Sequence, residues 1–145
     1  MIVKTRHFGI IVKDIKVSAN FYSKILGLDM KSELLENGNY FNKLINLDNK
    51  EAKVIKINIP DSTYIELIQF INLSSSQKTE LYNFDKVKQM HICFTVKEID
   101  KFYLNLKSLN VTFISPPLKS DFDPVKTCFF YDPDFNYVQI VEDTK

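Results

Sequence analysis

The sequence has few cysteines, no long apolar run and almost no net charge, and each of these absences excludes a class of protein. Its only cysteines, Cys93 and Cys128, lie far apart and form no Cys-x-x-Cys pair, so neither a zinc ribbon nor a redox pair is predicted. No apolar stretch approaches the roughly 20 residues that span a bilayer, and no secretory hydrophobic region is recognisable. We expect a cytoplasmic protein with reduced thiols and no membrane partner.

The distribution of charges argues against a nucleic-acid-binding protein. The formal net charge is +1 over 145 residues, and basic and acidic side chains are interspersed. A protein that follows a phosphate backbone would carry a basic stripe, so no nucleic-acid partner is expected. With 45% hydrophobic residues, the chain can bury a core as one domain over residues 1–145 or as two small fused modules.

A repeat organises the chain. Residues 7–15 and 91–99 align without a gap: both begin with histidine and end with Val-Lys, an acidic residue and Ile. Residues 64–69 (Tyr-Ile-Glu-Leu-Ile-Gln) likewise align with residues 137–142 (Tyr-Val-Gln-Ile-Val-Glu). One unit is therefore used twice, which places His7 against His91 and Glu66 against Gln139.

The residue patterns predict the same elements in both copies. In the first, strands are expected at 3–13, 29–36, 51–59 and 63–70 and a helix at 14–26, whereas 40–47 fits either a short helix or an irregular loop. In the second, strands are expected at 89–97, 111–114, 126–131 and 137–142, with a helix at 99–109 and a proline-rich loop after 114. The result is an α+β chain of two tandem βαβββ modules, residues 1–71 and 88–145, joined by a linker at 72–87.

The side chains that can bind a metal ion or accept a proton lie at the repeat-equivalent positions. If the modules pack about a pseudo-twofold axis, His7, Glu66, His91 and Gln139 come together. Two imidazoles and a carboxylate suit a divalent first-row ion with open positions for a substrate, and Gln139 would add a neutral oxygen. The alternative is that both histidines are ordinary strand residues and Glu66 lies on a solvated face. Cys93 shares strand parity with His91, but a packing role for this thiol is favoured.

These marks resemble the vicinal oxygen chelate superfamily, which includes glyoxalase I, methylmalonyl-CoA epimerase, extradiol dioxygenases, and fosfomycin- and bleomycin-resistance proteins. The matching residues cover nearly the whole chain: His7, Val12-Lys13-Asp14-Ile15, Phe21-Tyr22-x-x-x-Leu26-Gly27-Leu28, Ile65-Glu66-Leu67, His91 and Asp132-Pro133-Asp134-x-Asn136. The resemblance implies paired βαβββ modules whose curved mixed sheets enclose a cavity. It also implies a divalent ion (zinc, nickel, cobalt, manganese or iron) held by His7, Glu66, His91 and Gln139.

Two residues depart from the family pattern. The last metal position is usually Glu, and Gln139 cannot accept a substrate proton as a carboxylate would. Phe135 stands where the closing motif has Gly, so a turn that uses a permissive glycine must be reshaped or strained here. Glu142 does not replace the missing carboxylate, because strand alternation points it to the face opposite Gln139.

Three functions follow from the resemblance. The first is a metal-dependent lyase or isomerase of the glyoxalase I or epimerase kind, which acts on a small carbonyl substrate through a metal-chelated enediolate with Glu66 as the catalytic base. The second is a non-catalytic binding or antibiotic-resistance protein of the bleomycin-resistance kind. The third, ranked last, is an extradiol-type dioxygenase. A homodimer is expected, because open curved sheets leave edges that relatives cover by pairing modules.

Overall fold

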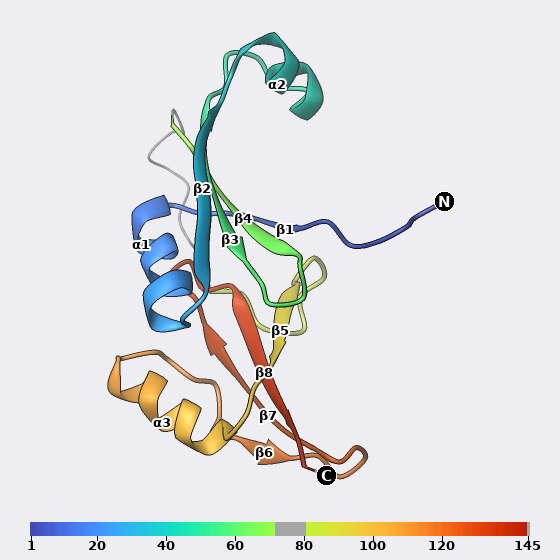
Figure 1. The fold of residues 1–145 in the computed structure, drawn as a ribbon, viewed down its shortest axis with the longest axis vertical. Coiled ribbons are helices and arrows are strands. Elements are labelled where there is room, and N and C mark those ends of the chain that lie inside the picture. Colours follow the sequence, from blue (N-terminus) through green and yellow to red (C-terminus); the bar gives the residue numbers. More distant parts are fainter. Residues whose placement is uncertain (72–80, 145) are drawn as a thin grey trace. The chain divides into compact units, whose positions relative to one another are not determined.

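The chain forms two compact units, and each contains one four-stranded sheet (Figure 1). The structure is a computed structural model that describes residues 1–71 and 81–144. The first module is Met1–Lys78 and the second is Thr79–Lys145. Within residues 1–71 and 81–144, no helix is long and apolar enough to cross a bilayer.

The first module has a mixed sheet with strand order β1-β4-β3-β2, in which only β1 and β4 run parallel. Its elements are β1 (Phe8–Ile11), α1 (Ile15–Asn20), a π-helical turn η1 (Phe21–Ile25), β2 (Asp29–Glu36), α2 (Gly38–Ile45), β3 (Ala52–Asn58) and β4 (Tyr64–Phe70). Asp14 begins α1 by accepting hydrogen bonds from the backbone N–H groups of Lys16 and Val17. Gly27, at φ 76°, provides the left-handed residue expected just after the helical segment.

Strand alternation gives this sheet one apolar and one polar face. Ile57, Ile65 and Leu67 are fully buried on the face that packs against α1. The residues between them point the other way, and Lys56 and Glu66 there are only half-buried. We call this second surface the open face, and it carries the candidate site.

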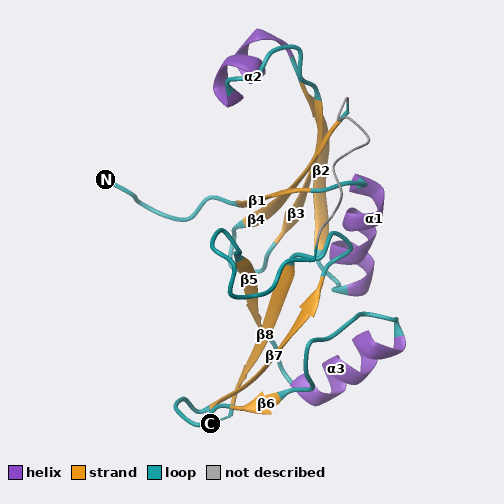
Figure 2. Cartoon of the chain, turned by 180° about the vertical axis from the view of Figure 1, so that it is seen from behind, coloured by secondary structure: helices purple, strands orange, loops and turns teal. Residues whose placement is uncertain are grey.

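The second module repeats the arrangement with strand order β5-β8-β7-β6, where β5 runs parallel to β8 (Figure 2). Its elements are β5 (His91–Thr95), α3 (Ile99–Ser108), β6 (Leu118–Lys119), β7 (Val125–Tyr131) and β8 (Tyr137–Asp143). Ile99, Leu106, Phe130 and Ile140 form its buried core. The predicted α+β fold of two βαβββ modules is confirmed, with sheets that are open rather than closed.

The repeat seen in the sequence is kept in the strand register. Glu66 lies opposite Gly9 across the β1–β4 pair, and Gln139 lies opposite Cys93 across the β5–β8 pair. Cys93 occupies the place of Gly9 in the aligned repeats. Glu66 and Gln139 therefore hold equivalent backbone positions, as the alignment predicted.

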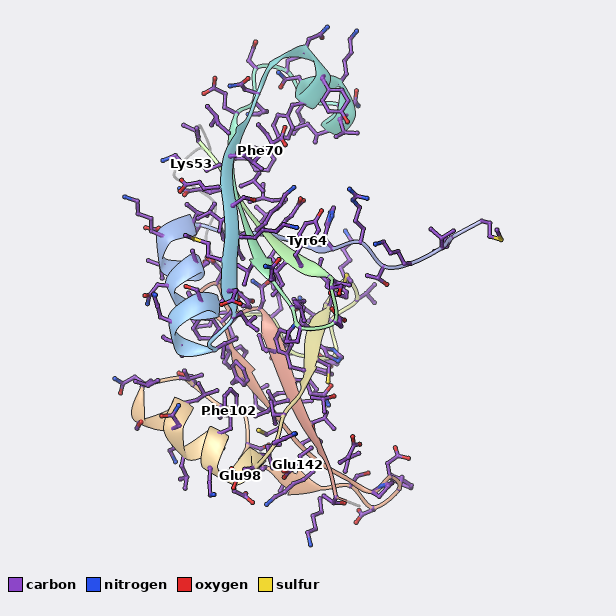
Figure 3. All side chains as sticks on the ribbon, in the orientation of Figure 1. Lys53, Tyr64, Phe70, Glu98, Phe102 and Glu142 are labelled. Atoms are coloured by element: carbon purple, nitrogen blue, oxygen red, sulfur yellow. The ribbon has the colours of Figure 1, made fainter. Side chains whose placement is uncertain are left out.

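The last strand of each module also caps the module's helix. The side-chain oxygen of Gln69 accepts a hydrogen bond from the Ile15 N–H at 3.1 Å. The Glu142 carboxylate accepts from the Ile99 N–H at 3.3 Å and also from the Glu98 N–H, and Figure 3 shows Glu98 and Glu142 close together. Glu142 is therefore turned toward α3, which agrees with the prediction that it cannot replace a carboxylate at Gln139.

Some predicted element boundaries were wrong. The first strand is Phe8–Ile11 rather than 3–13. In the register of the β1–β4 pair, residues 3–6 would lie opposite residues 60–63, which form the turn before β4. Residues 111–114 form only an isolated bridge through Phe113 to Phe130, and the strand β6 follows within the expected loop. Two prolines at 116–117 cannot donate to a ladder, so pairing resumes only after them. The ambiguous segment 40–47 is largely the helix α2.

The β7–β8 turn adopts the strained geometry expected from Phe135. Phe135 has φ 64°, in the left-handed region that favours glycine. The turn is held by Asp132, whose carboxylate accepts hydrogen bonds from the backbone N–H groups of Asp134 and Asn136 and from the Asn136 side chain. Ser62, the repeat-equivalent residue in the β3–β4 turn, has a similar φ of 70°.

The predicted linker at 72–87 falls partly outside the described residues, which omit 72–80. In its later part, the Phe84 ring packs against Phe129 and Tyr137 of the second module, with centroid distances of 5.0 and 4.9 Å. The Tyr137 hydroxyl donates to the Tyr82 carbonyl at 2.7 Å. Tyr82 and Phe84 thus contact the strands of the second module.

Candidate functional site

Glu66 lies at the centre of a charged cluster on the open face of the first module. Its Oε2 is 3.3 Å from His7 Nε2, and its Oε1 is 3.3 Å from Lys56 Nζ. Lys56 is its direct partner across the β3–β4 pair, and His7 comes just before β1 on the other side. Only 17% of the Glu66 side chain is exposed. The carboxylate is therefore held by one basic group at each oxygen.

Tyr64 extends this cluster along β4. Its ring lies 5.3 Å from the His7 ring between centroids. The ammonium groups of Lys56 and Lys31 lie 5.2 and 5.4 Å from the Tyr64 ring centroid, within the range of a cation–π interaction. Two like charges thus converge on one aromatic ring, and Glu66 balances only Lys56.

The pair of His7 and Glu66 fits a divalent ion by donor type and by spacing. Ligands at the usual 2.0–2.2 Å from a first-row ion lie about 3 Å apart when they occupy adjacent positions, close to the distance between Nε2 and Oε2 here. No group of three or more His, Cys, Asp or Glu side chains is gathered within residues 1–71 and 81–144, so further donors are required. Lys56 is a competitor, because its positive charge already lies against the same carboxylate.

His91 and Gln139 occupy the equivalent positions of the second module but have different neighbours. The His91 ring lies 5.3 Å from Phe129 and 5.9 Å from Phe84 between centroids. The Gln139 side-chain amide donates to the Thr127 hydroxyl at 2.9 Å, and Thr127 donates to the Ile140 carbonyl. In the described part of the second module, no hydrogen bond joins His91 to Gln139, in contrast with the close pair formed by His7 and Glu66.

The cysteines are poor candidates for a reactive role. Partial burial raises the pKa of the Cys93 thiol, and burial raises that of Cys128 to about 11. Because the thiolate is the metal ligand and the nucleophile, a raised pKa keeps both groups protonated and weak near neutral pH. The raised pKa argues against Cys93 as a metal ligand. Cys93 is exposed, however, so the packing role expected for this thiol is wrong, and of the two cysteines only Cys128 is buried.

The sequence analysis missed Lys56 and Tyr64. A signal for Lys56 was present in the predicted hairpin, because a turn centred on Asp61 places residues 56 and 66 opposite each other. Tyr64 is part of the aligned repeat. Its contact with Lys31, however, arises where the pairing of β2 with β3 is irregular, between Met30 and Ser32. No local pattern predicts that irregularity.

Comparison with known proteins agrees with this architecture. The sequence matches the Glyoxalase/Bleomycin resistance protein/Dioxygenase superfamily over residues 4–140. No curated protein sequence matches significantly.

Solved structures share the fold at low identity. A glyoxalase family protein from Bacillus cereus has a TM-score of 0.89 at 14% identity, with 100% of this chain and 97% of that chain covered. A glyoxalase/dioxygenase from Nostoc punctiforme has a TM-score of 0.69 at 23% identity, with 98% and 92% covered. A genomically encoded fosfomycin resistance protein from Listeria monocytogenes has a TM-score of 0.64 at 20% identity, with 98% and 94% covered. The resemblance drawn from the sequence is confirmed, and the chain belongs to the Glyoxalase/Bleomycin resistance protein/Dioxygenase superfamily.

Proposed function

We propose that this protein is a metal-dependent lyase or isomerase that moves a proton on a small carbonyl substrate, with Glu66 as the base. The observation that supports this most strongly is the position of the Glu66 carboxylate, half-buried on the open face between His7 and Lys56. A carboxylate fixed in this way has one defined orientation toward a ligand above the sheet. Positioned general bases contribute roughly 10²- to 10⁴-fold to rate.

In the proposed reaction, Glu66 accepts the proton of a C–H bond next to a carbonyl group, and the electrons of that bond move toward the carbonyl oxygen. Glu66 then returns the proton to a carbon of the same substrate, so that no oxidant or reductant is consumed. Lys56 holds one carboxylate oxygen in place during both transfers, which leaves the other oxygen to take and return the proton. Gln139 cannot share this work, because an amide does not accept a proton near neutral pH.

A divalent ion is part of the proposal, with His7, Glu66, His91 and Gln139 as its ligands. When bound, the ion would supply positive charge at the oxygens of the substrate. One carboxylate and three neutral ligands leave a dication with a formal charge of +1, which favours an anionic substrate. The same loss of negative charge weakens metal retention, and Lys56 adds to this effect by competing for Glu66.

A homodimer is proposed as the assembly. The first sheet leaves large apolar side chains in solvent, including Ile11 on the open face at 61% and Met30 on the outer strand β2 at 58% exposure. Burying such surface between two copies would be favourable, and most soluble oligomers are symmetric dimers. Light scattering tests this directly, and a chain that stays monomeric at micromolar concentration contradicts it.

A turnover assay with hemithioacetal and acyl-CoA substrates, in the presence of zinc, nickel, cobalt, manganese or ferrous ions, tests the chemistry. Glu66→Gln keeps the shape of the side chain but removes the base, so we expect turnover to fall at least about 100-fold. Glu33→Gln, at an exposed position of β2, is the matched control and should turn over as wild type does. Full activity of Glu66→Gln would contradict the proposal.

A second candidate function is a binding or resistance protein that holds a ligand without turnover. Two observations favour it: an ammonium group lies against the single carboxylate of the site, and the equivalent position in the second module is an amide. The same assay separates the two functions. A ligand that binds with unchanged strength to wild type and to Glu66→Gln, and is recovered unaltered from both, supports this second function.

A further inference from the structure

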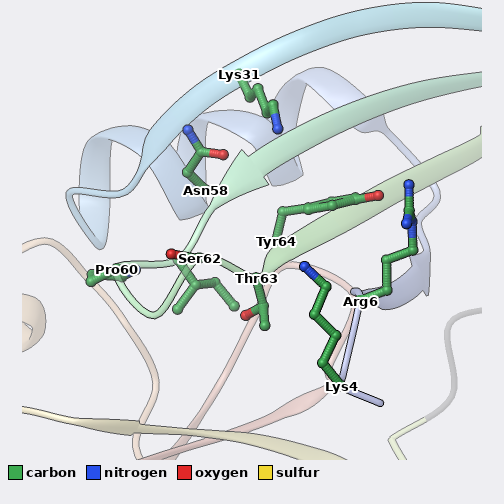
Figure 4. Close-up of a pocket in the computed structure, with 9 residues that line it drawn as sticks. Lys4, Arg6, Lys31, Asn58, Pro60, Ser62, Thr63 and Tyr64 are labelled. Carbon is green, nitrogen blue, oxygen red and sulfur yellow. The ribbon is translucent and has the colours of Figure 1, made fainter. Parts of the chain in front are cut away.

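We propose that the first module binds a small oxyanion, the phosphate or carboxylate group of a ligand, in a pocket beside Tyr64. The pocket has a volume of about 450 Å³ and is lined by Lys4, Arg6, Lys31 and Tyr64, with Asn58 and Thr63 at its edge. Figure 4 shows Lys31 reaching toward the Tyr64 ring from β2, while Lys4 and Arg6 approach from the segment before β1. Three cationic side chains from two distant parts of the sequence therefore meet in one hollow.

The charge of this pocket is not balanced by the protein. No acidic side chain lines it, and among the described residues no carboxylate lies within 4 Å of the cationic groups of Lys4, Arg6 or Lys31. Lys56 is different, because Glu66 neutralises it. Asp61, in the adjoining turn, accepts hydrogen bonds from the Thr63 backbone and hydroxyl, and these bonds lower the pKa of its carboxyl. The pocket lining keeps three formal positive charges against the one carboxylate of Asp61 in the adjoining turn, and this excess attracts and concentrates anions.

The side chains present match the chemistry of an oxyanion. A guanidinium group can donate two parallel hydrogen bonds to a phosphate or carboxylate, and lysines add point charges. Asn58 and Thr63 can donate further hydrogen bonds at the edge. The three cations line one half-open hollow rather than a stripe along the surface, so the fit is to one small anionic group rather than to a nucleic-acid backbone.

The pocket adjoins the candidate site through Tyr64, which borders both. Glu66 lies two residues further along β4, so the two locations are about 7 Å apart at 3.3–3.4 Å per residue. A substrate held by its anionic group could thus place a neighbouring carbon near Glu66. Only this last step rests on the proposed function, because anion binding does not depend on what Glu66 does.

The test is calorimetric titration of the full chain with inorganic phosphate and, separately, with malonate as a carboxylate probe. We expect saturable binding of at least one probe, weaker as sodium chloride is raised, because exposed charges are screened by salt. Arg6→Met and Lys31→Met should each weaken binding by about tenfold, corresponding to about 1.4 kcal/mol per charged contact. Lys53→Met removes a lysine of β3 that does not line the pocket and should bind as wild type.

The two probes identify the chemistry, and the variants decide the site. Stronger phosphate binding indicates a phosphorylated ligand, and stronger malonate binding indicates a carboxylate. Absence of saturable binding to either probe at millimolar concentration, or equal binding by wild type and both pocket variants, would overturn the proposal. Glu66→Gln should keep or strengthen anion binding, because it frees the charge of Lys56 beside Tyr64. Loss of turnover in that variant and loss of anion binding in Arg6→Met therefore report on two separate proposals.

Discussion

The two modules share a backbone plan but differ in the chemistry of their open faces. In the first, Glu66 lies among His7, Lys56 and Tyr64. In the second, the equivalent Gln139 bonds to Thr127, and Phe129 replaces Lys56 at the cross-strand position. The apolar face is more alike, since Leu67 and Ile140 are equivalent and both buried. The repeat has kept its core and register, and its open faces have become one charged and one aromatic surface.

The carboxylate that the second module lacks at Gln139 is found three residues later, at Glu142. The first module has Glu66 on the open face and Gln69 at the start of its helix, whereas the second has Gln139 on the open face and Glu142 at the start of its helix. At these two equivalent positions, each final strand therefore carries one acid and one amide, in opposite order. The acid of the second module hydrogen-bonds to the start of α3, whereas the acid of the first module lies on the open face.

The largest expected effect comes from the shared core. Leu67→Ala and Ile140→Ala should each lower the free energy of unfolding by about 2–5 kcal/mol, because both side chains are fully buried and leave cavities. Ile68→Ala, at a half-buried position of the open face, should cost less. Urea unfolding followed by circular dichroism measures all three. If one core variant lowers the free energy of unfolding by less than about 1 kcal/mol and the other lowers it by much more, the two cores are not equivalent.

A smaller effect is expected at the left-handed turn residues. Phe135→Gly should stabilise the second module by up to about 1 kcal/mol, because glycine adopts φ 64° without strain. Ser62→Gly makes the same test in the first module. Phe135→Ala is the control, since it removes the ring but keeps the Cβ atom that causes the strain. A gain in the alanine variant equal to that in the glycine variant would assign the effect to the exposed ring.

The smallest effect concerns the swapped caps. Glu142→Gln should destabilise the second module by about 0.3–1 kcal/mol, because it removes a negative charge from the positive end of α3. Gln69→Glu should be neutral or stabilising by a similar amount at α1. Thermal unfolding at low and high salt checks both, since screening weakens the effect. Equal stability of Glu142→Gln and wild type at low salt would show that the charge at this position is unimportant.

Much of this architecture could be predicted from the sequence, because each half of the repeat supports the assignment of strands and helix in the other half. The spacing of His7 to Ile15, matched at His91 to Ile99, fixed the first strand and helix of each module, and the shared closing motif fixed the equivalence of Glu66 and Gln139. What could not be predicted depends on neighbours from other strands. In the sequence, nothing distinguishes Lys56 from the other lysines. Its position opposite Glu66 follows only from the register of the β3–β4 hairpin. The anion pocket needs residues at 4, 6 and 31 to meet at Tyr64, and no sequence period encodes that meeting.

Glu66 is proposed as the anionic ligand and the base of the site, and Gln139 as a weaker, neutral ligand. Titration of the apoprotein with cobalt(II), followed by its visible absorption, tests this most directly in wild type, Glu66→Gln, Gln139→Ala and the control Glu33→Gln. We predict a saturable site in wild type and in the control, at least tenfold weaker affinity in Glu66→Gln, and a smaller loss in Gln139→Ala. Equal affinity of Glu66→Gln and wild type, or no saturable cobalt site in wild type, would contradict the account.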